Sequence, residues 1–243
     1  MSGSVLMHAA SPPLPGWYGK IPALGDFASR RLPPGFIAAW DAWLQEGMAA
    51  SRSSLKERWL ETYLNGPLWN FALLPGVCGE SAWAGVMMPS VDKVGRHFPL
   101  TLAVELAPVP EVLASLLSAQ HWFCGMEQLA LECLDVGFDP AVLEERLAGS
   151  AFPVIADGWD RDGAQRIDRW WSASAGTVLS LDIPSRAGLC ELFWEAGSHH
   201  YGRTGRGKSL WWSEPASGGA IQLLAFSGLP AKNDFEALLG DAG

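Results

Sequence analysis

Residues 68–106 read LWNFALLPGVCGESAWAGVMMPSVDKVGRHFPLTLAVEL. Three apolar segments lie within this stretch, at 68–74, 82–88 and 98–106. In the last segment, Phe98 and every second residue after it are apolar, whereas Thr101 and Glu105 lie on the other face. That alternation is typical of a strand with one buried face. The short connections favour antiparallel neighbours, because a parallel pair needs a crossover of about a dozen residues. The stretch therefore predicts three antiparallel strands.

Apolar residues at helical spacing precede these strands. Phe36, Trp40 and Trp43 follow a pair of prolines, so a helix is predicted to begin at the prolines. A second helix is predicted to begin at Ser53 or Ser54. Elsewhere the pattern predicts strands at 16–21, 177–182, 209–213 and 220–226, helices at 110–134, 140–147 and 234–239, and a helix or strand at 185–196. Helices before, between and after the strands predict an α/β fold, an αβα sandwich around a mostly antiparallel mixed sheet.

The length and composition indicate one globular domain. Of the 243 residues, 49% are hydrophobic and 18% are charged, which is typical of a chain that buries a large core. Residues 1–15 are mostly small and rich in proline, and we expect them to be a flexible N-terminal segment. We expect 16–243 to form a single α/β domain, with two intimate lobes, 16–150 and 151–243, as the alternative.

The charge of the chain limits the classes of partner. Its formal net charge of −9 opposes binding to nucleic acid or to an anionic membrane, since both need a basic face. The N-terminal segment lacks the basic start and apolar run of a secretory signal. No segment reaches the roughly 18 uninterrupted apolar residues of a membrane span. We therefore expect a cytoplasmic protein with no nucleic-acid partner and no direct insertion into a membrane.

Cysteine and histidine are not spaced as metal ligands. No two of the four cysteines have C-x-x-C spacing, and Cys78, in a glycine-rich turn, is the only one expected to be exposed. The pair His199-His200 has no cysteine or acid at ligand spacing. We therefore predict a solvated loop at these histidines, and no metal site.

Acidic residues gather later in the chain, at Asp157, Asp160, Asp162 and Asp168. The first three have the spacing D-x-x-D-x-D, which differs from the alternate acids of a calcium loop, so a solvated turn is predicted. The hydrolase motifs G-x-S-x-G and H-E-x-x-H are absent. The sequence predicts no catalytic residue and no cofactor, and we expect that the protein is not an enzyme.

Residues 202–209, GRTGRGKS, match the P-loop pattern G-x-x-x-x-G-K-[ST], from Gly202 to Ser209. A P-loop binds phosphates between a preceding strand and a following helix. Residues 189–195 supply a candidate strand, but 210–215 look like a strand and end at a proline before a helix can form. We interpret 202–209 as the basic tip of a hairpin and keep nucleotide binding as an alternative function.

The chain contains 13 tryptophans, among them the pairs Trp170-Trp171 and Trp211-Trp212. Neighbouring side chains of a strand point to opposite faces, so at least one tryptophan of each pair is expected to be exposed or covered by another layer or a partner. Large aromatic side chains are common in protein-binding hot spots. The tryptophans therefore favour a protein that binds partners.

Two sets of residues stand out when they are compared together. The first is Gly16-Trp17-Tyr18-Gly19-Lys20-Ile21-Pro22, Gly25-Asp26-Phe27, and a helix with Phe36, Trp40-Asp41 and Trp43-Leu44. The second is Gly85-Val86, Pro89-Ser90-Val91-Asp92, Val94-Gly95-Arg96 and Phe98-Pro99-Leu100. Together they resemble the TagF family, also called ImpM, of type VI secretion-associated proteins. Two motifs in the right order are more specific than one short pattern.

The resemblance implies an α/β fold and a cytoplasmic accessory protein of the type VI secretion system. It implies post-translational negative regulation through binding of a forkhead-associated-domain scaffold protein, with an assembly chaperone of the same machine as the alternative. It supplies no catalytic residue. The candidate partner-binding residues are the polar motif residues Asp26, Ser90, Asp92 and Arg96. Alternatively these residues fix loops, with Asp92 and Arg96 as an ion pair that pins a turn and Asp26 as a cap.

Overall fold

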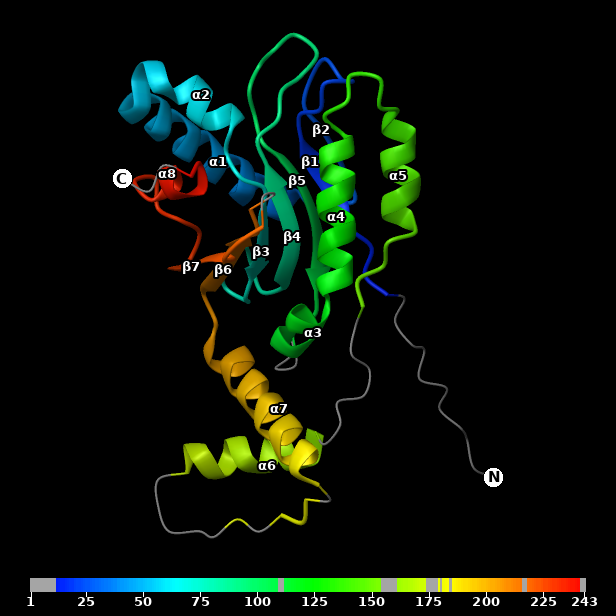
Figure 1. The fold of residues 1–243 in the computed structure, drawn as a ribbon, viewed down its shortest axis with the longest axis vertical. Coiled ribbons are helices and arrows are strands. Elements are labelled where there is room, and N and C mark those ends of the chain that lie inside the picture. The colour runs from blue at the N-terminus through cyan, green and yellow to red at the C-terminus, as the bar shows by residue number, and fades with distance from the viewer. Residues whose placement is uncertain are drawn as a thin grey trace.

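A seven-stranded sheet forms the centre of the described structure (Figure 1). This computed structural model describes residues 12–108, 112–153, 161–173, 179, 181–183, 185–215 and 218–240. The strands are β1 (Gly16–Gly19), β2 (Ala28–Arg30), β3 (Trp69–Leu73), β4 (Ala82–Met88), β5 (Leu100–Leu106), β6 (Lys208–Ser213) and β7 (Gln222–Ser227). Their order is β2-β1-β5-β4-β3-β6-β7, and every neighbouring pair is antiparallel. The described sheet is therefore antiparallel, where a mostly antiparallel mixed sheet was expected.

Helices cover both faces of this sheet. They are α1 (Pro34–Leu55), α2 (Trp59–Leu64), α3 (Val112–Ser118), α4 (Gln120–Glu132), α5 (Pro140–Ala148), α6 (Arg161–Ser172), α7 (Arg186–Thr204) and α8 (Phe235–Leu238). Figure 1 shows α1, α2 and α8 on one face, and α4 and α5 on the other. The predicted αβα sandwich is confirmed.

The pleat of the sheet divides the apolar side chains between two cores. On β4, Trp83 packs in the core that contains α1, whereas Val86 packs in the core that contains α4. Successive side chains of a strand point to opposite faces, so one strand supplies both cores. Trp40 of α1 is fully buried, and its indole Nε1 donates to Thr101 Oγ1 on β5 at 2.9 Å. This bond satisfies the one polar group that burial of the indole removes from water.

The prediction for the second helix was wrong in its boundary. Helix α1 starts at the predicted prolines but continues through Ser53 and Ser54 to Leu55. A 3-10 turn over Lys56–Arg58 follows, and α2 begins at Trp59 without a side-chain cap. Burial of Leu55 and Trp59 therefore sets the helix boundary, and the serines do not.

The long helix predicted at 110–134 is divided in two. Helices α3 and α4 meet at Ala119, whose backbone leaves the helical region while its side chain stays buried. Residues 109–111 lie outside the described residues. The short strand β2 was not predicted, because three residues are too few to show a periodic pattern.

Three further predictions fall partly outside the described residues. Of the flexible segment 1–15, only 12–15 are described. Of the strand predicted at 177–182, the described residues are not in a strand. Of the solvated turn predicted at Asp157, Asp160 and Asp162, only Asp162 is described, and it lies on helix α6, so that part of the prediction was wrong.

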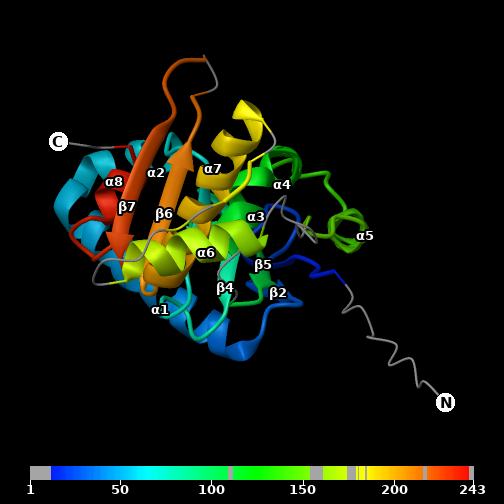
Figure 2. The ribbon, with the colours of Figure 1, turned by 90° about the horizontal axis from the view of Figure 1, so that it is seen from below.

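Helices α6 and α7 form a pair beyond one end of the sheet. Helix α7 extends over Arg186–Thr204, packs against α3 and α6, and leads into β6. In the view from below, α6 lies across the end of the sheet (Figure 2). The two helices share a small hydrophobic cluster with Ile167 and Leu192 at its centre, separate from the two cores of the sheet. None of the described helices has both the length and the apolar character needed to cross a membrane.

Candidate functional site

The residues of the two motifs lie on loops that meet at one end of the sheet. The loop of residues 20–27 follows β1, and the loop of residues 89–99 joins β4 to β5 (Figure 1). Lys93 N donates to Leu24 O at 2.9 Å, which joins the two loops through their backbones. We call residues 20–27 and 89–99 the paired loops.

Asp92 is the centre of the paired loops. Its carboxylate is buried and accepts hydrogen bonds from Lys20 Nζ at 2.6 Å and from Arg96 Nε at 2.6 Å. The backbone N–H groups of Val94 and Arg96 donate to its other oxygen at 3.1 and 2.8 Å. Desolvation raises the pKa of Asp92, but the hydrogen bonds from Lys20 and Arg96 outweigh it and hold that pKa well below its usual range. Asp92 is therefore a fixed anion.

Arg96 connects the two loops from the surface. In addition to its bond with Asp92, its Nη2 donates to Gly25 O at 2.6 Å and lies 3.6 Å from Asp26 Oδ1. The side chain is 54% exposed. The Asp92–Arg96 pair spans a turn in which Gly95 has a φ of +81°, a conformation that favours glycine. Arg96 thus holds the turn and also presents part of its guanidinium to solvent.

Ser90 fixes the second loop to helix α2. Its backbone N–H donates to Tyr63 Oη at 3.0 Å, and the Tyr63 hydroxyl donates to its backbone carbonyl at 2.9 Å. The Ser90 side chain is buried, and its hydroxyl has no partner among the described residues. Burial raises the pKa of Tyr63, so this hydroxyl keeps its proton. The backbone of Ser90, and not its side chain, makes the described contacts.

The outer surface of the paired loops combines charge with apolar area. Asp26 has a side chain that is 80% exposed, and Val94 and Phe27 are 71% and 45% exposed. The Phe27 ring packs against Phe98 with 4.7 Å between centroids, and Lys20 Nζ lies 4.5 Å from the Phe27 centroid. Asp26 and Arg96 can touch a partner directly, whereas the buried Ser90 and Asp92 act on it only through the loops that they hold.

Three residues of the paired loops were not predicted as part of the site: the exposed Phe27 and Val94, and the buried Lys20. Phe27 and Lys20 both belong to the first motif, but neither was assigned a role. A lysine between Gly19 and Ile21, at the end of a buried strand, is the signal that could have identified a buried ion pair. Its partner Asp92 lies 72 positions away, too far for any local pattern.

The structure does not form a P-loop at residues 202–209. Gly202 lies inside helix α7, which ends at Thr204, and Lys208 and Ser209 begin strand β6. A P-loop needs the opposite order, a strand before the loop and a helix after it. Ser209 Oγ donates to Gly228 O at 2.6 Å, so its hydroxyl is committed to the fold. The expected hairpin tip was also wrong, because a helix precedes the turn.

A polar cluster joins α6 to α7, where solvated segments were predicted. Asp168 is buried, and its carboxylate lies 3.1 Å from His199 Nδ1, 2.8 Å from His200 Nδ1 and 2.5 Å from Arg203 Nη1. Desolvation raises the pKa of Asp168, but its hydrogen bonds to His200 and Arg203 hold it below its usual range. The prediction of a solvated loop at the histidines was therefore wrong. No described group of His, Cys, Asp or Glu is arranged to hold a metal ion.

The tryptophan pairs differ in their surroundings. Trp211 is fully buried beneath α1, and Trp212 packs against Phe123 of α4, with 4.8 Å between ring centroids. Trp211 and Trp212 are therefore each covered by a layer of helices, which is one of the alternatives predicted for this pair. Trp170 and Trp171 lie on helix α6 and are 43% and 69% exposed.

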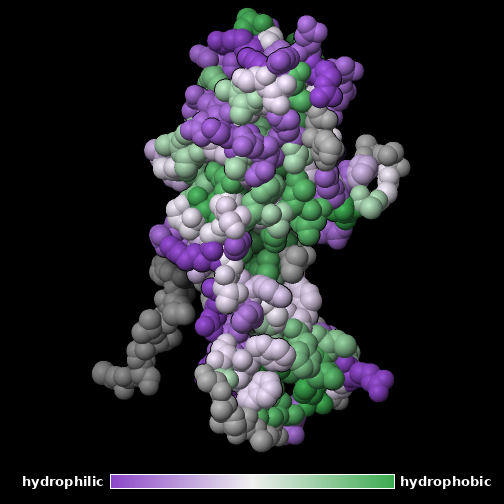
Figure 3. All heavy atoms as spheres, turned by 90° about the vertical axis from the view of Figure 1, so that its left-hand side faces the viewer, coloured by the Kyte–Doolittle hydropathy of each residue, from purple (hydrophilic) through white to green (hydrophobic). Residues whose placement is uncertain are grey.

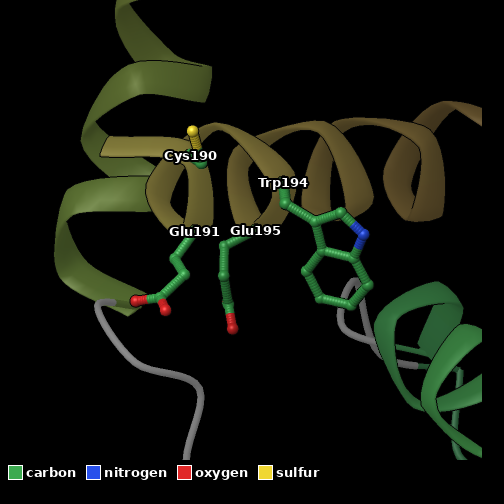
Figure 4. Close-up of a pocket in the computed structure, with 4 residues that line it drawn as sticks. All are labelled: Cys190, Glu191, Trp194 and Glu195. Atoms are coloured by element: carbon green, nitrogen blue, oxygen red, sulfur yellow. The ribbon is translucent and has the colours of Figure 1, made fainter. Parts of the chain in front are cut away.

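A shallow hollow of about 330 Å³ lies on helix α7. Glu191, Trp194 and Glu195 project into it from one side of the helix, and Cys190 projects from the opposite side (Figure 4). Among the described contacts, none joins the Cys190 thiol of this hollow to either carboxylate or to a histidine, so the hollow shows no nucleophile paired with a base. We therefore assign the paired loops, and not this hollow, as the candidate site.

Comparison with known proteins agrees with this architecture. A family profile described as the TagF N-terminal domain, type VI secretion system-associated, matches residues 16–149. The search of curated proteins found no match. The crystal structure of PA0076 from Pseudomonas aeruginosa PAO1 is similar, with a TM-score of 0.70 and 33% identity over 94% of this chain and 96% of that one. The chain therefore belongs to the TagF family of type VI secretion system-associated proteins.

Proposed function

We propose that this accessory protein of the type VI secretion system is a negative regulator that acts after translation. In this proposal it binds a forkhead-associated-domain scaffold protein through the paired loops and so withholds the scaffold from the machine. The observation that carries the proposed binding site is the Lys20–Asp92–Arg96 cluster, which locks two distant loops into one surface. The class of partner rests on the family to which the chain belongs.

Rigidity of the paired loops favours a binding role. A surface that is already ordered loses less conformational entropy on association than a mobile one. Arg96 is fixed by Asp92 and Gly25 O, and Phe27 is fixed by its ring contacts, so both side chains are held in place before a partner arrives. Arginine and large aromatic residues are the types that most often dominate protein interfaces.

The same cluster favours binding over catalysis. A general base needs a pKa near the working pH, and that of Asp92 is held far below it. The ammonium of Lys20 is paired with this carboxylate and buried beneath Phe27, so it is not offered as a nucleophile. We therefore propose that the protein does not act as an enzyme at this site.

The cysteines support a cytoplasmic location for this function. All four are free, and Cys124 and Cys190 are exposed. Exposed free thiols are typical of a reducing compartment, since an oxidising one would pair or modify them.

Secretion and capture together test the proposal. The tagged protein is expressed in a host with an active type VI machine, and its captured proteins are identified by mass spectrometry. We expect enrichment of the forkhead-associated scaffold and reduced secretion of a machine component. Arg96→Ala should lose both effects, whereas Arg146→Ala, which changes another partly exposed arginine on α5, should retain both. Capture without the scaffold, or repression that survives Arg96→Ala, would contradict the proposed site.

A further inference from the structure

Strand β7 is an open edge of the sheet. It is last in the strand order and pairs only with β6. Within the described parts of the chain, no backbone group of Gln222–Ser227 bonds to a segment other than β6. Figure 3 looks at the molecule from the side of this edge, and hydrophobic residues form a band across the middle of that face. An edge of this kind is a template for another strand.

The side chains of β7 do not protect the edge. Residues 221–227 read IQLLAFS and contain neither a charge nor a proline. Ile221 and Leu223, on the same face, are 58% and 63% exposed. Proteins usually block free edges with short strands, charges, prolines or a covering segment, so a six-residue uncharged edge is unusual.

The opposite edge of the same sheet is protected. Strand β2 has three residues and ends at Arg30, with Arg31 next to it. The Arg31 guanidinium bonds to Pro15 O and to Glu144, so it lies across that end of the sheet. The difference between the two edges indicates that β7 is left open for pairing.

We propose that β7 pairs with β7 of a second copy of this chain, antiparallel across a two-fold axis, and joins two sheets into one. A two-fold interface brings each surface against itself, so it must be self-complementary. An uncharged strand meets this condition, because no like charges oppose each other across the axis. In this pairing the two-fold axis passes beside Leu223, the most exposed large apolar side chain of β7, so Leu223 of one copy lies next to Leu223 of the other.

Charges at the two ends of the β6–β7 hairpin favour the antiparallel arrangement. Exposed Lys208 lies at one end, where its Nζ donates to Ser227 Oγ at 2.7 Å. Exposed Glu214 lies at the other end, directly beyond the Ser213–Gln222 pair. Antiparallel pairing places the Lys208 end of one copy beside the Glu214 end of the other, whereas parallel pairing would place like charges together.

Sedimentation equilibrium of the purified full chain tests this proposal. Across a series from about 1 to 100 μM, the mass should rise from 26.2 kDa towards twice that value. Leu223→Lys and Leu223→Glu should each raise the dissociation constant by at least about tenfold, since each buries like charges near the axis. Val136→Lys, at a residue 74% exposed in the loop between α4 and α5, should dimerise as the wild type does.

Mixing the two Leu223 variants distinguishes self-pairing of β7 from any other association. An equimolar mixture should form a heterodimer, because a lysine then lies close to a glutamate across the axis. That recovery also shows that both variants are folded. A monomeric wild type over the whole range, dimers of either variant as stable as the wild type, or no recovery on mixing would each overturn the proposal.

Discussion

Lys20 Nζ lies 2.6 Å from Asp92 Oδ2, and neither side chain has more than 4% of its surface exposed. The two residues are separated by 72 positions and come from the two paired loops. A buried charge requires a partner, so each loop is held in place by a residue of the other. Arg96 adds a second cation to the same carboxylate oxygen from the solvent side. The paired loops therefore form one unit, and removing either buried charge should disturb both.

Lys20→Met should destabilise the fold, because it leaves the buried Asp92 carboxylate with one cation fewer. We expect the Tm to fall by roughly 5–10 °C in a thermal melt followed by circular dichroism. The double variant Lys20→Met, Asp92→Leu should recover part of the loss, since no unpaired buried charge remains. As a control, Asp26→Ala, at a side chain 80% exposed, should change the Tm by less than about 2 °C. Equal effects of Lys20→Met and Asp26→Ala would show that the pair does not hold the loops.

The lowered pKa of Asp92 predicts how the stability of the fold depends on pH. Its pKa is lower in the folded chain than the ordinary value of 3.8, so on acidification the unfolded chain takes up this proton first. The stabilisation is complete above pH 3.8 and is lost as the pH falls below that value towards the folded pKa. Urea unfolding between pH 4 and pH 2 should therefore give a smaller loss of stability per pH unit in Asp92→Asn than in the wild type. Identical slopes would contradict this assignment.

The four thiols should divide into two classes of reactivity. Cys124 and Cys190 are exposed, whereas burial raises the pKa of Cys78 and of Cys133 to about 12. The sequence predicted exposure of Cys78 alone, and that was wrong, because its turn packs against the core containing α1. Ellman's reagent should modify two thiols of the native protein and four after denaturation. If the double variant Cys124→Ser, Cys190→Ser loses its reactivity in the native state, the two reactive thiols are those of Cys124 and Cys190. Rapid reaction of Cys78 in the native protein would contradict the structure.

Asp168→Ala should loosen α6 from α7 while the sheet remains intact. The substitution leaves His199, His200 and Arg203 without their common partner, and the hydrophobic cluster between the two helices is small. We expect amide hydrogen exchange in α6 to accelerate by at least about tenfold, with exchange in β4 and β5 unchanged. Asp162→Ala, at a side chain 79% exposed on the same helix, is the matched control. Unchanged exchange in Asp168→Ala would show that the cluster does not join the helices.

The centre of the fold could be predicted from the sequence, because its signals are local. Strand β4 has the predicted bounds, and the alternation in 98–106 identifies β5. The expectation of a single buried face was wrong, because Thr101 and Ala103 on the second face are also buried, beneath α1. Each of these strands is almost fully buried, so each appears in the sequence as a short, mostly apolar segment of strand length.

The segment from α6 to β6 could not be predicted, because its structure depends on distant contacts. Helix α7 contains three glycines and no clear apolar stripe, and its packing against α3 and α6 overrides that weak propensity. The burial of Asp168 could not be predicted, because the partners of its carboxylate lie 31 to 35 positions away in the sequence. The letters of residues 202–209 match a P-loop, but a motif has its chemistry only between the right elements.

The candidate site was predicted in part. The Asp92–Arg96 pair was identified as a structural alternative because the two residues are four positions apart, and the structure contains it. The contact of Arg96 with Gly25 and the burial of Lys20 join the two motifs in space, which no spacing in the sequence shows.

Calorimetric titration of the purified scaffold into this protein tests the central claim most directly. We predict saturable binding by the wild type. For Arg96→Ala we predict a dissociation constant at least tenfold larger, a loss of binding free energy on the order of 1.4 kcal/mol, with an unchanged circular dichroism spectrum. Arg146→Ala, whose arginine is 38% exposed and paired with Glu132 away from the paired loops, should bind as the wild type does. Absence of binding by the wild type, or equal binding by Arg96→Ala, would contradict the account.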